Sequence, residues 1–258
     1  MYNTDSMKPK ICVFANQKGG VGKTTSAVSL GAYIAEAGKR VLLIDFDPQG
    51  NLTSSIGIDG SGPGIYEALT GNAEFIDVVQ KTESENLWGV SSNINLTGAN
   101  VELIEVEDRE YFLKNTINGS GGEWDYIFID SPPSLGILTI NGLAAADYVM
   151  VPLQCEYFAL EGLSLLLQTI QKIQKGANPG LKLGGIFFTM YDSRTRLAHE
   201  VVEEVTALFG DRVFRTIIPR NVRLSEAPSH SKTINRYDPG CIGAKSYQKL
   251  ALEVMERV

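Results

Sequence analysis

Apolar residues gather in short, nearly uninterrupted runs along the chain. Six runs of five to eight residues are rich in Val, Ile and Phe and do not alternate with polar positions. Such runs are typical of strands that are buried on both faces of a parallel sheet. We therefore predict strands over residues 10–16, 40–45, 126–130, 148–153, 183–190 and 213–219.

Longer stretches, with apolar residues three and four positions apart, lie between some of these runs. This spacing is typical of amphipathic helices. We predict helices over residues 24–37, 160–174, 195–209 and 243–257. In the second of them one face carries Leu160, Leu163, Leu166, Leu167 and Ile170. We expect this face to pack in the core, with a protein interface as the alternative.

Strands and helices alternate without a break in composition, which predicts one α/β domain. The expected fold is a mostly parallel twisted sheet with helices on both faces. We assign the domain to residues 9–258 and expect residues 1–8 to be a flexible tail. The pattern is weaker over residues 50–125, where we expect loops, short helices and a strand near Leu87–Val90.

Composition narrows the class of protein. The chain has no apolar run of about 18 residues, the length of a membrane span, and its N-terminus lacks the apolar core of a signal peptide. We therefore expect a cytoplasmic protein. Three widely spaced cysteines give no reason to expect disulfides. The net charge of −7 argues against a protein coated with positive charge, although it allows a local basic face.

The segment "GGVGKTT" follows a predicted strand and opens a predicted helix, which is the context of a phosphate-binding loop. Glycines let successive backbone N–H groups turn into one concavity, and the helix N-terminus adds positive potential there. We expect Lys23 to reach the β- and γ-phosphates and the Thr24 hydroxyl to bind Mg²⁺. The predicted phosphate-binding residues are Gly19, Gly20, Val21, Gly22, Lys23, Thr24 and Thr25.

Acidic residues stand at the ends of two predicted strands. Asp45 and Asp47 close the strand over 40–45, and Asp130 closes the strand over 126–130. Carboxyl ends of parallel strands face the ligand crevice. Asp130 therefore fits a Walker B residue that holds Mg²⁺ directly or through water. A helix cap or turn is the alternative role for any one of these residues.

The loop differs from the common phosphate-binding pattern in having Lys18 directly before its glycine pair. In this respect "KGGVGKTT" resembles the deviant Walker A motif of P-loop ATPases. Two longer segments, over residues 138–163 and 218–230, resemble the ParA/Soj family of chromosome- and plasmid-partition ATPases. The resemblance extends from residue 8 onward.

That resemblance implies roles for individual residues. Lys18 would reach across a two-fold interface to the phosphates of the partner's ATP. Asp47 would orient or activate the attacking water, and Asp45 would support the loop or a metal-bound water. Pro219 and Asn221 would line the adenine pocket. The stretch 158–161 would lie near the dimer face, and "DSPPSLG" would be a switch segment that responds to the γ-phosphate.

A basic stretch stands out in this acidic chain. Residues 212–236 contain six arginines and lysines against one acid, which gives +5. Arg194 and Arg223 match positions that carry non-specific DNA binding in Soj-like proteins. The alternative is that surface arginines pair with Asp192, Glu200 and Glu204. His199 and His230 have no apparent nucleophile near them, so we expect surface or loop positions.

The expected function is that of an ATP-dependent dimerising ATPase with slow, partner-stimulated hydrolysis. The resemblance implies a homodimer with ATP and Mg²⁺ that binds nucleoid DNA and acts with a ParB-type protein. One alternative is a membrane-cycling ATPase similar to MinD, although the last helix carries few cations. Another is an electron-transfer protein similar to the nitrogenase iron protein, which would need cluster cysteines in the switch segments.

Overall fold

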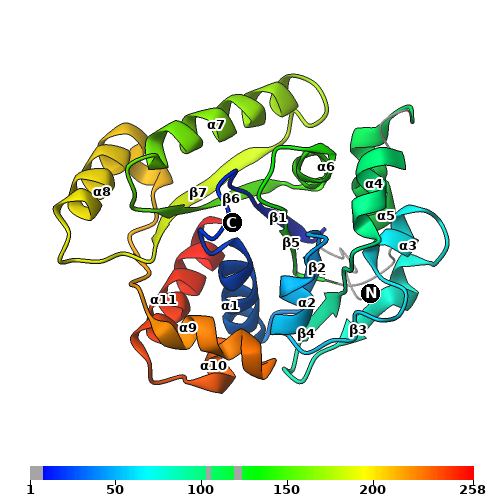
Figure 1. The fold of residues 1–258 in the computed structure, drawn as a ribbon, viewed down its shortest axis with the longest axis horizontal. Coiled ribbons are helices and arrows are strands. Elements are labelled where there is room, and N and C mark those ends of the chain that lie inside the picture. The colour runs from blue at the N-terminus through cyan, green and yellow to red at the C-terminus, as the bar shows by residue number, and fades with distance from the viewer. Residues whose placement is uncertain (1–7, 103–105, 119–123) are drawn as a thin grey trace, which may run out of the picture.

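The computed structural model describes residues 8–102, 106–118 and 124–258, and within them the chain forms a seven-stranded sheet (Figure 1). The strand order is β3-β4-β2-β5-β1-β6-β7, and neighbours are parallel except for β3 and β4. The strands are β1 (Lys10–Phe14), β2 (Val41–Asp45), β3 (Val79–Lys81), β4 (Leu87–Val90), β5 (Tyr126–Asp130), β6 (Tyr148–Gln154) and β7 (Lys182–Thr189).

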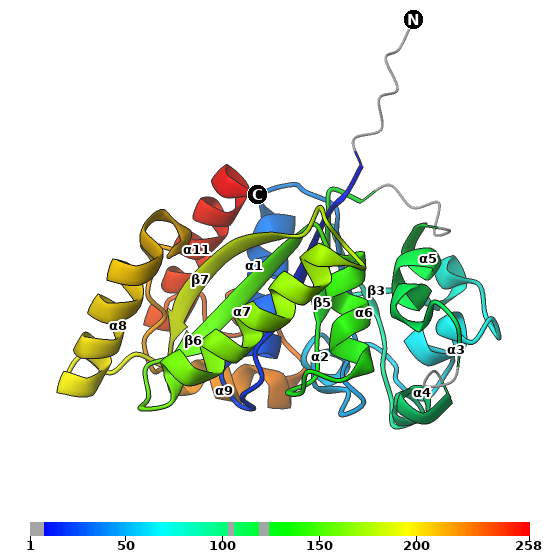
Figure 2. The same ribbon diagram turned by 90° about the horizontal axis from the view of Figure 1, so that it is seen from above.

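Helices cover both faces of the sheet. The α-helices are α1 (Lys23–Glu36), α2 (Asn51–Ser55), α3 (Ile65–Leu69), α4 (Leu96–Glu102), α5 (Phe112–Asn118), α6 (Ile137–Ala145), α7 (Ala159–Lys175), α8 (Arg196–Phe209), α9 (Val222–Glu226), α10 (Ile234–Tyr237) and α11 (Ile242–Arg257). Short 3₁₀ helices span Phe75–Val78, Arg109–Tyr111, Gly210–Arg212 and Ala227–His230. Figures 1 and 2 show α7 and α8 on one side of the sheet and α1 and α11 on the other.

The continuous apolar strands serve two cores. Successive side chains of β1 point to opposite faces of the sheet. Ile11 and Val13 therefore pack with α3 to α8, whereas Cys12 and Phe14 pack with α1 and α11, and all four are at most 4% exposed. This double burial explains why the strand sequences do not alternate. The predicted fold class, a mostly parallel sheet covered on both faces, is confirmed.

The four predicted helices are confirmed, with ends that differ from the prediction by one residue at most. The apolar face of α7 is a core face: Leu163, Leu166 and Ile170 are buried, and Leu160 and Leu167 pack against them. The predicted strand near Leu87–Val90 is β4. The predicted tail lies, except for residue 8, outside the described residues. No helix of the described ranges is both long enough and apolar enough to cross a membrane.

The strand predicted over residues 213–219 is wrong. Phe214 N–H donates to the Ile186 carbonyl (2.8 Å) and Ile218 N–H to the Phe188 carbonyl (2.9 Å). The segment forms isolated bridges, one with Ile186 of β7 and one with Tyr191 just past β7, and no continuous strand. Between these contacts, the N–H groups of Arg215 and Thr216 donate to the carboxylate of Glu253 on α11, each at 2.9 Å. The Glu253 side chain thus accepts from the backbone N–H groups that would otherwise pair with β7 in a continuous strand.

This arrangement makes Glu253 a residue that holds the 213–219 segment to the C-terminal helix. Glu253→Ala should lower the free energy of unfolding by about 1–3 kcal/mol, because two backbone donors lose a charged acceptor. Urea denaturation would measure the change. Glu256→Ala, an exposed carboxylate on the same helix, serves as the control and should stay close to wild type. Equal stability of the two variants would contradict the assigned role.

Candidate nucleotide-binding site

The loop between β1 and α1 is built on a buried asparagine and two left-handed glycines. The Asn16 side-chain amide donates to the Pro152 carbonyl in β6 (2.8 Å), and its oxygen accepts from Lys18 N–H (3.0 Å). Gly20 and Gly22 have φ values of +74° and +88°, which favour glycine. Because α1 starts directly after Gly22, the loop presents its N–H groups together with the helix N-terminus.

Two side-chain groups of the loop, the amine of Lys23 and the hydroxyl of Thr24, make contacts within the protein. Lys23 is 6% exposed, and its Nζ donates to the Lys18 carbonyl across the loop (3.2 Å). Burial lowers the pKa of Lys23, while the charges of Asp130 and Asp47 act in the opposite direction. Thr24 Oγ1 donates to Asp130 Oδ2 at 2.6 Å. The structure therefore brings together the predicted metal-binding pair.

Asp130 of this pair is one of three carboxylates that gather here. Asp45 and Asp130 are register partners at the ends of β2 and β5, and both are fully buried. Asp45 Oδ2 accepts from the N–H and Oγ1 of Thr53, both at 2.7 Å. Asp47 is 8% exposed, and its Oδ1 accepts from Gln49 N–H (3.0 Å). Carboxylates so close together and so little hydrated favour a cation among them.

Burial dominates the protonation of Asp45 and Asp130. It raises the pKa of Asp45 to about 6, against the opposing effect of the Thr53 hydrogen bonds. Burial and the charge of Asp45 together raise the pKa of Asp130 well above its ordinary value. Asp130 Oδ1 is buried and has no hydrogen-bond partner among the described residues. An orphaned carboxylate oxygen next to the Thr24 hydroxyl fits the oxygen ligand set that Mg²⁺ prefers.

The Lys18 amine pairs with a carboxylate outside this cluster. It forms an ion pair with Glu156, in the connection from β6 to α7, and the two side chains are 44% and 47% exposed. Glu156 was not among the residues predicted from the sequence. The residues lie 138 positions apart, so no local pattern could have related them.

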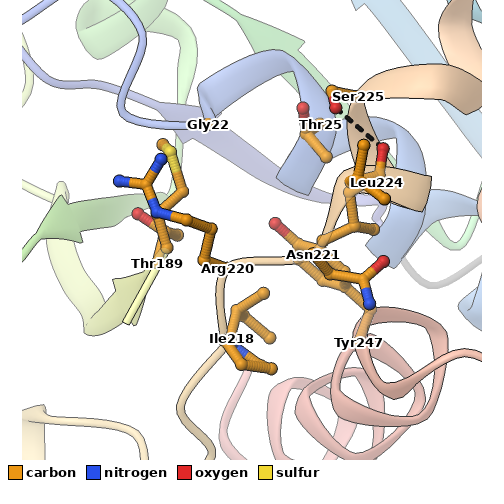
Figure 3. Close-up of a pocket in the computed structure, with 12 residues that line it drawn as sticks. Gly22, Thr25, Thr189, Ile218, Arg220, Asn221, Leu224, Ser225 and Tyr247 are labelled. Carbon is orange, nitrogen blue, oxygen red and sulfur yellow. Dashed lines mark hydrogen bonds between the residues drawn. The ribbon is translucent and has the colours of Figure 1, made fainter. Parts of the chain in front are cut away.

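A pocket of about 410 Å³ lies beside Gly22 and Thr25. Its walls are Ile218, Pro219, Arg220, Asn221, Val222, Leu224 and Ser225 from one segment, with Thr189, Met190 and Tyr247 (Figure 3). The two predicted adenine-pocket residues, Pro219 and Asn221, thus lie next to the phosphate loop. Asn221 Oδ1 accepts from Arg223 N–H (3.1 Å), which fixes its amide at the start of α9. A mostly apolar slot of this kind suits a planar base.

Some pocket residues were not identified from the sequence. Thr189 Oγ1 donates to the Val21 carbonyl (2.8 Å), and Tyr247 Oη lies 2.8 Å from Ser26 Oγ. Each contact joins residues more than 160 positions apart. Arg220 was counted only within the basic stretch, yet Figure 3 shows its side chain extending past Thr189 at one end of the pocket. Its position in the sequence, directly between Pro219 and Asn221, could have indicated that it lines the same pocket.

The two predicted DNA-binding arginines lie outside the pocket and are both paired with acids. Arg194 follows β7 and makes two hydrogen bonds to Asp192, and Arg223 Nη1 lies 2.8 Å from Glu226 Oε2. Arg196 pairs with Glu200 at 2.7 Å. The alternative of surface arginines paired with nearby acids is therefore observed at Asp192 and Glu200.

Comparison with known proteins identifies relatives of the whole chain. A family model described as an AAA domain matches residues 9–183. The chromosome-partitioning ATPase Soj of Treponema pallidum is 58% identical over 248 residues, which cover 96% of this chain and 98% of that protein. This level of identity over nearly the full length makes the match far stronger than a shared loop motif alone.

Solved structures carry the ligands that this site would suggest. Cobyrinic acid a,c-diamide synthase from Mycobacterium smegmatis, with bound ADP and magnesium, is 38% identical with a TM-score of 0.84, and the match covers 96% of this chain and 95% of that one. A putative plasmid partition protein from Borrelia burgdorferi, bound to AMPPNP, is 28% identical with a TM-score of 0.84, covering 96% and 99%. The fold of this chain is thus one that holds nucleotide in similar proteins.

Buried Asp45 and Asp130 should make the protein less stable as the pH rises. With pKa values raised in the fold, they retain protons at a pH where the unfolded chain has lost them, so the free energy of unfolding falls as the pH rises from about 4 through about 6. Asp130→Asn should therefore be more stable than wild type at pH 7.5, by about 1–3 kcal/mol, with the difference shrinking toward pH 4. Urea denaturation at several pH values measures this.

Asp77→Asn removes the same charge from an exposed position and should leave the profile unchanged. A loss of stability in Asp130→Asn at pH 7.5 would contradict the inference that burial of the Asp130 carboxylate lowers the free energy of unfolding. The same variant should fail to hydrolyse ATP, so stability and activity should change in opposite directions.

Proposed function

The chain belongs to the ParA/Soj family of chromosome- and plasmid-partitioning ATPases, and we propose that it is a nucleotide-switched member that dimerises around ATP and Mg²⁺. In this proposal the dimer binds nucleoid DNA without sequence preference, and slow hydrolysis, stimulated by a ParB-type protein, releases it. The observation that carries the proposal is the contact of Thr24 with Asp130, beside the buried amine of Lys23.

The chain's own groups have distinct tasks in nucleotide binding. The N–H groups of residues 19–25 hold phosphate oxygens, and Lys23 neutralises the β- and γ-phosphates. Thr24 and Asp130 would hold Mg²⁺, which supplies charge neutralisation at the transferring phosphoryl group when bound. Asp47 orients the attacking water, and Asp45 supports Asp47 through the Asp47 N–H (3.3 Å). Pro219 and Asn221 line the base pocket.

Lys18 is proposed to complete the partner's phosphate site. Its ion pair with Glu156 is about half exposed, and such pairs contribute little stability, so the amine can exchange a carboxylate for a phosphate at small cost. Next to Glu156, Tyr157 and Phe158 are 79% and 65% exposed and pack on each other at 5.0 Å. An exposed aromatic pair beside the phosphate loop supports an interface at this edge.

Arg194 and Arg223 are proposed to contact DNA phosphates. Each lies on the surface of a single chain, so two subunits together present twice the number of contacts. A dimer is then a bivalent ligand whose affinity can far exceed that of one subunit. Contacts of this kind give sequence-tolerant binding that weakens steeply with salt.

The membrane-cycling alternative has less support. The apolar face of α11 packs onto α1 through Ala244, Tyr247, Leu250 and Val254, all at most 1% exposed. A helix that inserts into lipid needs that face for the membrane. In this chain the apolar face of α11 is already packed in the core, so we do not propose membrane binding through this helix.

Lys18→Ala should retain nucleotide binding but lose ATP-dependent dimerisation, because the loop and Lys23 remain while the amine supplied to the partner is gone. Light scattering with a non-hydrolysable ATP analogue measures the mass of the complex, and fluorescent nucleotide measures binding. Lys39→Ala, an exposed lysine between α1 and β2 at the opposite edge of the sheet, is the matched control. If the Lys18 variant dimerised at the same nucleotide concentrations as wild type, the proposed role of Lys18 in the partner's phosphate site would be rejected.

DNA retention should depend on both nucleotide and the two arginines. Asp47→Ala, which should hold ATP without turnover, is used to keep the dimer assembled. In that background Arg194→Glu or Arg223→Glu should lower DNA affinity at least about tenfold at low salt, since each replaces an attractive charge with a repulsive one in both subunits.

Filter retention of duplex DNA with ATP, ADP or no nucleotide gives the readout, with Lys39→Glu as the control for charge reversal. Retention that is equal in all three nucleotide conditions, or equal in the arginine variants, would reject the proposed switch. Dimerisation should be unaffected by either arginine variant.

A further inference from the structure

Arg194 is held by its neighbour Asp192 in a closed pair. Arg194 Nε donates to Asp192 Oδ1 (2.8 Å) and Nη2 donates to Oδ2 (2.7 Å), while Arg194 N–H donates to Oδ1 (3.1 Å). This two-pronged geometry is the one with which a guanidinium also binds a phosphate. The Arg194 side chain is 86% exposed, so the carboxylate, not the protein interior, is what occupies its donors.

Asp192 also lies within the field of a second arginine. The hydrogen bonds from Arg194 hold the pKa of Asp192 well below its ordinary value, and the charge of Arg220 contributes in the same direction. The backbone of Arg220 also lies close to this segment, because Arg220 N–H donates to the carbonyl of Tyr191, the residue before Asp192 (3.0 Å). Asp192 is therefore paired with Arg194 and lies within the field of Arg220, the arginine that lines the pocket in Figure 3.

The other arginine proposed to bind DNA is paired in the same way. Arg223 Nη1 lies 2.8 Å from Glu226 Oε2, and its Nε lies 3.4 Å from Asp238 Oδ2. Both candidate DNA contacts thus face acidic side chains of their own chain, one at Arg194 and two at Arg223. The pairing at Arg194 is the more complete of the two, because both oxygens of one carboxylate are engaged.

We propose that Asp192 is a built-in competitor of DNA phosphate for Arg194, so that DNA must displace this carboxylate in order to bind. The inference rests on the proposed DNA-binding function and adds a residue that sets its affinity. Asp192 acts through Arg194 and contacts no nucleic acid itself. Its effect is to keep a single chain weakly attractive to DNA and to sharpen the difference between one subunit and two.

Two measurable consequences distinguish competition from general repulsion. Neutralising Asp192 should tighten DNA binding about two- to five-fold per subunit, the range expected for an exposed ion pair. The salt dependence should also become steeper, by up to about one ion per subunit. In wild type, the displaced carboxylate takes up a cation that offsets one released from the DNA, and the variant lacks that uptake.

Asp192→Asn is the test variant, because an asparagine oxygen still accepts from Arg194 N–H and preserves the turn before α8. Glu200→Gln is the matched control, since it removes the same charge from the exposed pair with Arg196, one helix turn into α8. Fluorescence anisotropy of labelled duplex DNA with AMPPNP, over a series of salt concentrations, measures affinity and slope. Thermal unfolding of each variant checks the fold.

A double variant isolates the pair. Asp192→Asn should give no gain in a background of Arg194→Gln, because the competitor has then lost its target. A gain in Asp192→Asn that Glu200→Gln lacks, and that disappears in the double variant, would support the inference. Equal gains in Asp192→Asn and Glu200→Gln would overturn it in favour of general charge.

The remaining outcomes separate this inference from the function on which it rests. Wild-type DNA binding that Asp192→Asn leaves unchanged or weakens would overturn the competitor role alone. Absence of binding by both wild type and Asp192→Asn with AMPPNP, at every salt concentration, would overturn DNA binding itself, and the competitor role with it. Measurable binding by Asp192→Asn, where wild type shows none, would support both.

Discussion

Two buried carboxylates face each other across neighbouring strands, and the site depends on the donors and positive charge that must surround them. The register of β2 with β5 places Asp45 opposite Asp130, and neither side chain reaches solvent. Donors from Thr53 and Thr24, and the buried amine of Lys23, offset part of the cost. One oxygen of Asp130 stays without a hydrogen-bond partner among the described residues. The fold thus holds charge that a bound cation would stabilise, which trades stability for ligand affinity.

Much of the fold could be predicted because its signals are local. Strands such as β1 and β5 are buried on both faces, so their apolar runs are continuous and hard to mistake. The long helices α7 and α8 have clear apolar faces. Short elements of the 50–125 region, such as α2 and β3, span only five and three residues and carry no comparable pattern. The phosphate loop was identifiable for the same reason as the strands, because its residues are consecutive.

What the sequence did not reveal depends on contacts between distant residues. The segment 213–219 has the composition of a strand, but Glu253, 37 positions after Thr216, takes its central N–H groups. Glu156 reaches Lys18, and Tyr247 reaches Ser26, across still larger separations. In each case a side chain from later in the chain contacts a polar group of an earlier segment. The walls of the pocket are formed in this way, since α11 and the 218–225 segment both pack against α1.

The charges of the basic stretch show why the net charge counted along a segment differs from the charge that the folded surface presents. Six cations against one acid give +5 over residues 212–236, yet Asp238 and Glu83, both outside that window, lie 3.4 Å and 3.2 Å from Arg223 and Arg236. Arg194 is likewise matched by Asp192. A single chain therefore presents arginines whose charge is largely compensated where it stands. Under the proposed function this compensation is useful: an acidic protein that must leave DNA after hydrolysis needs each subunit to bind weakly, so that affinity comes from pairing two of them.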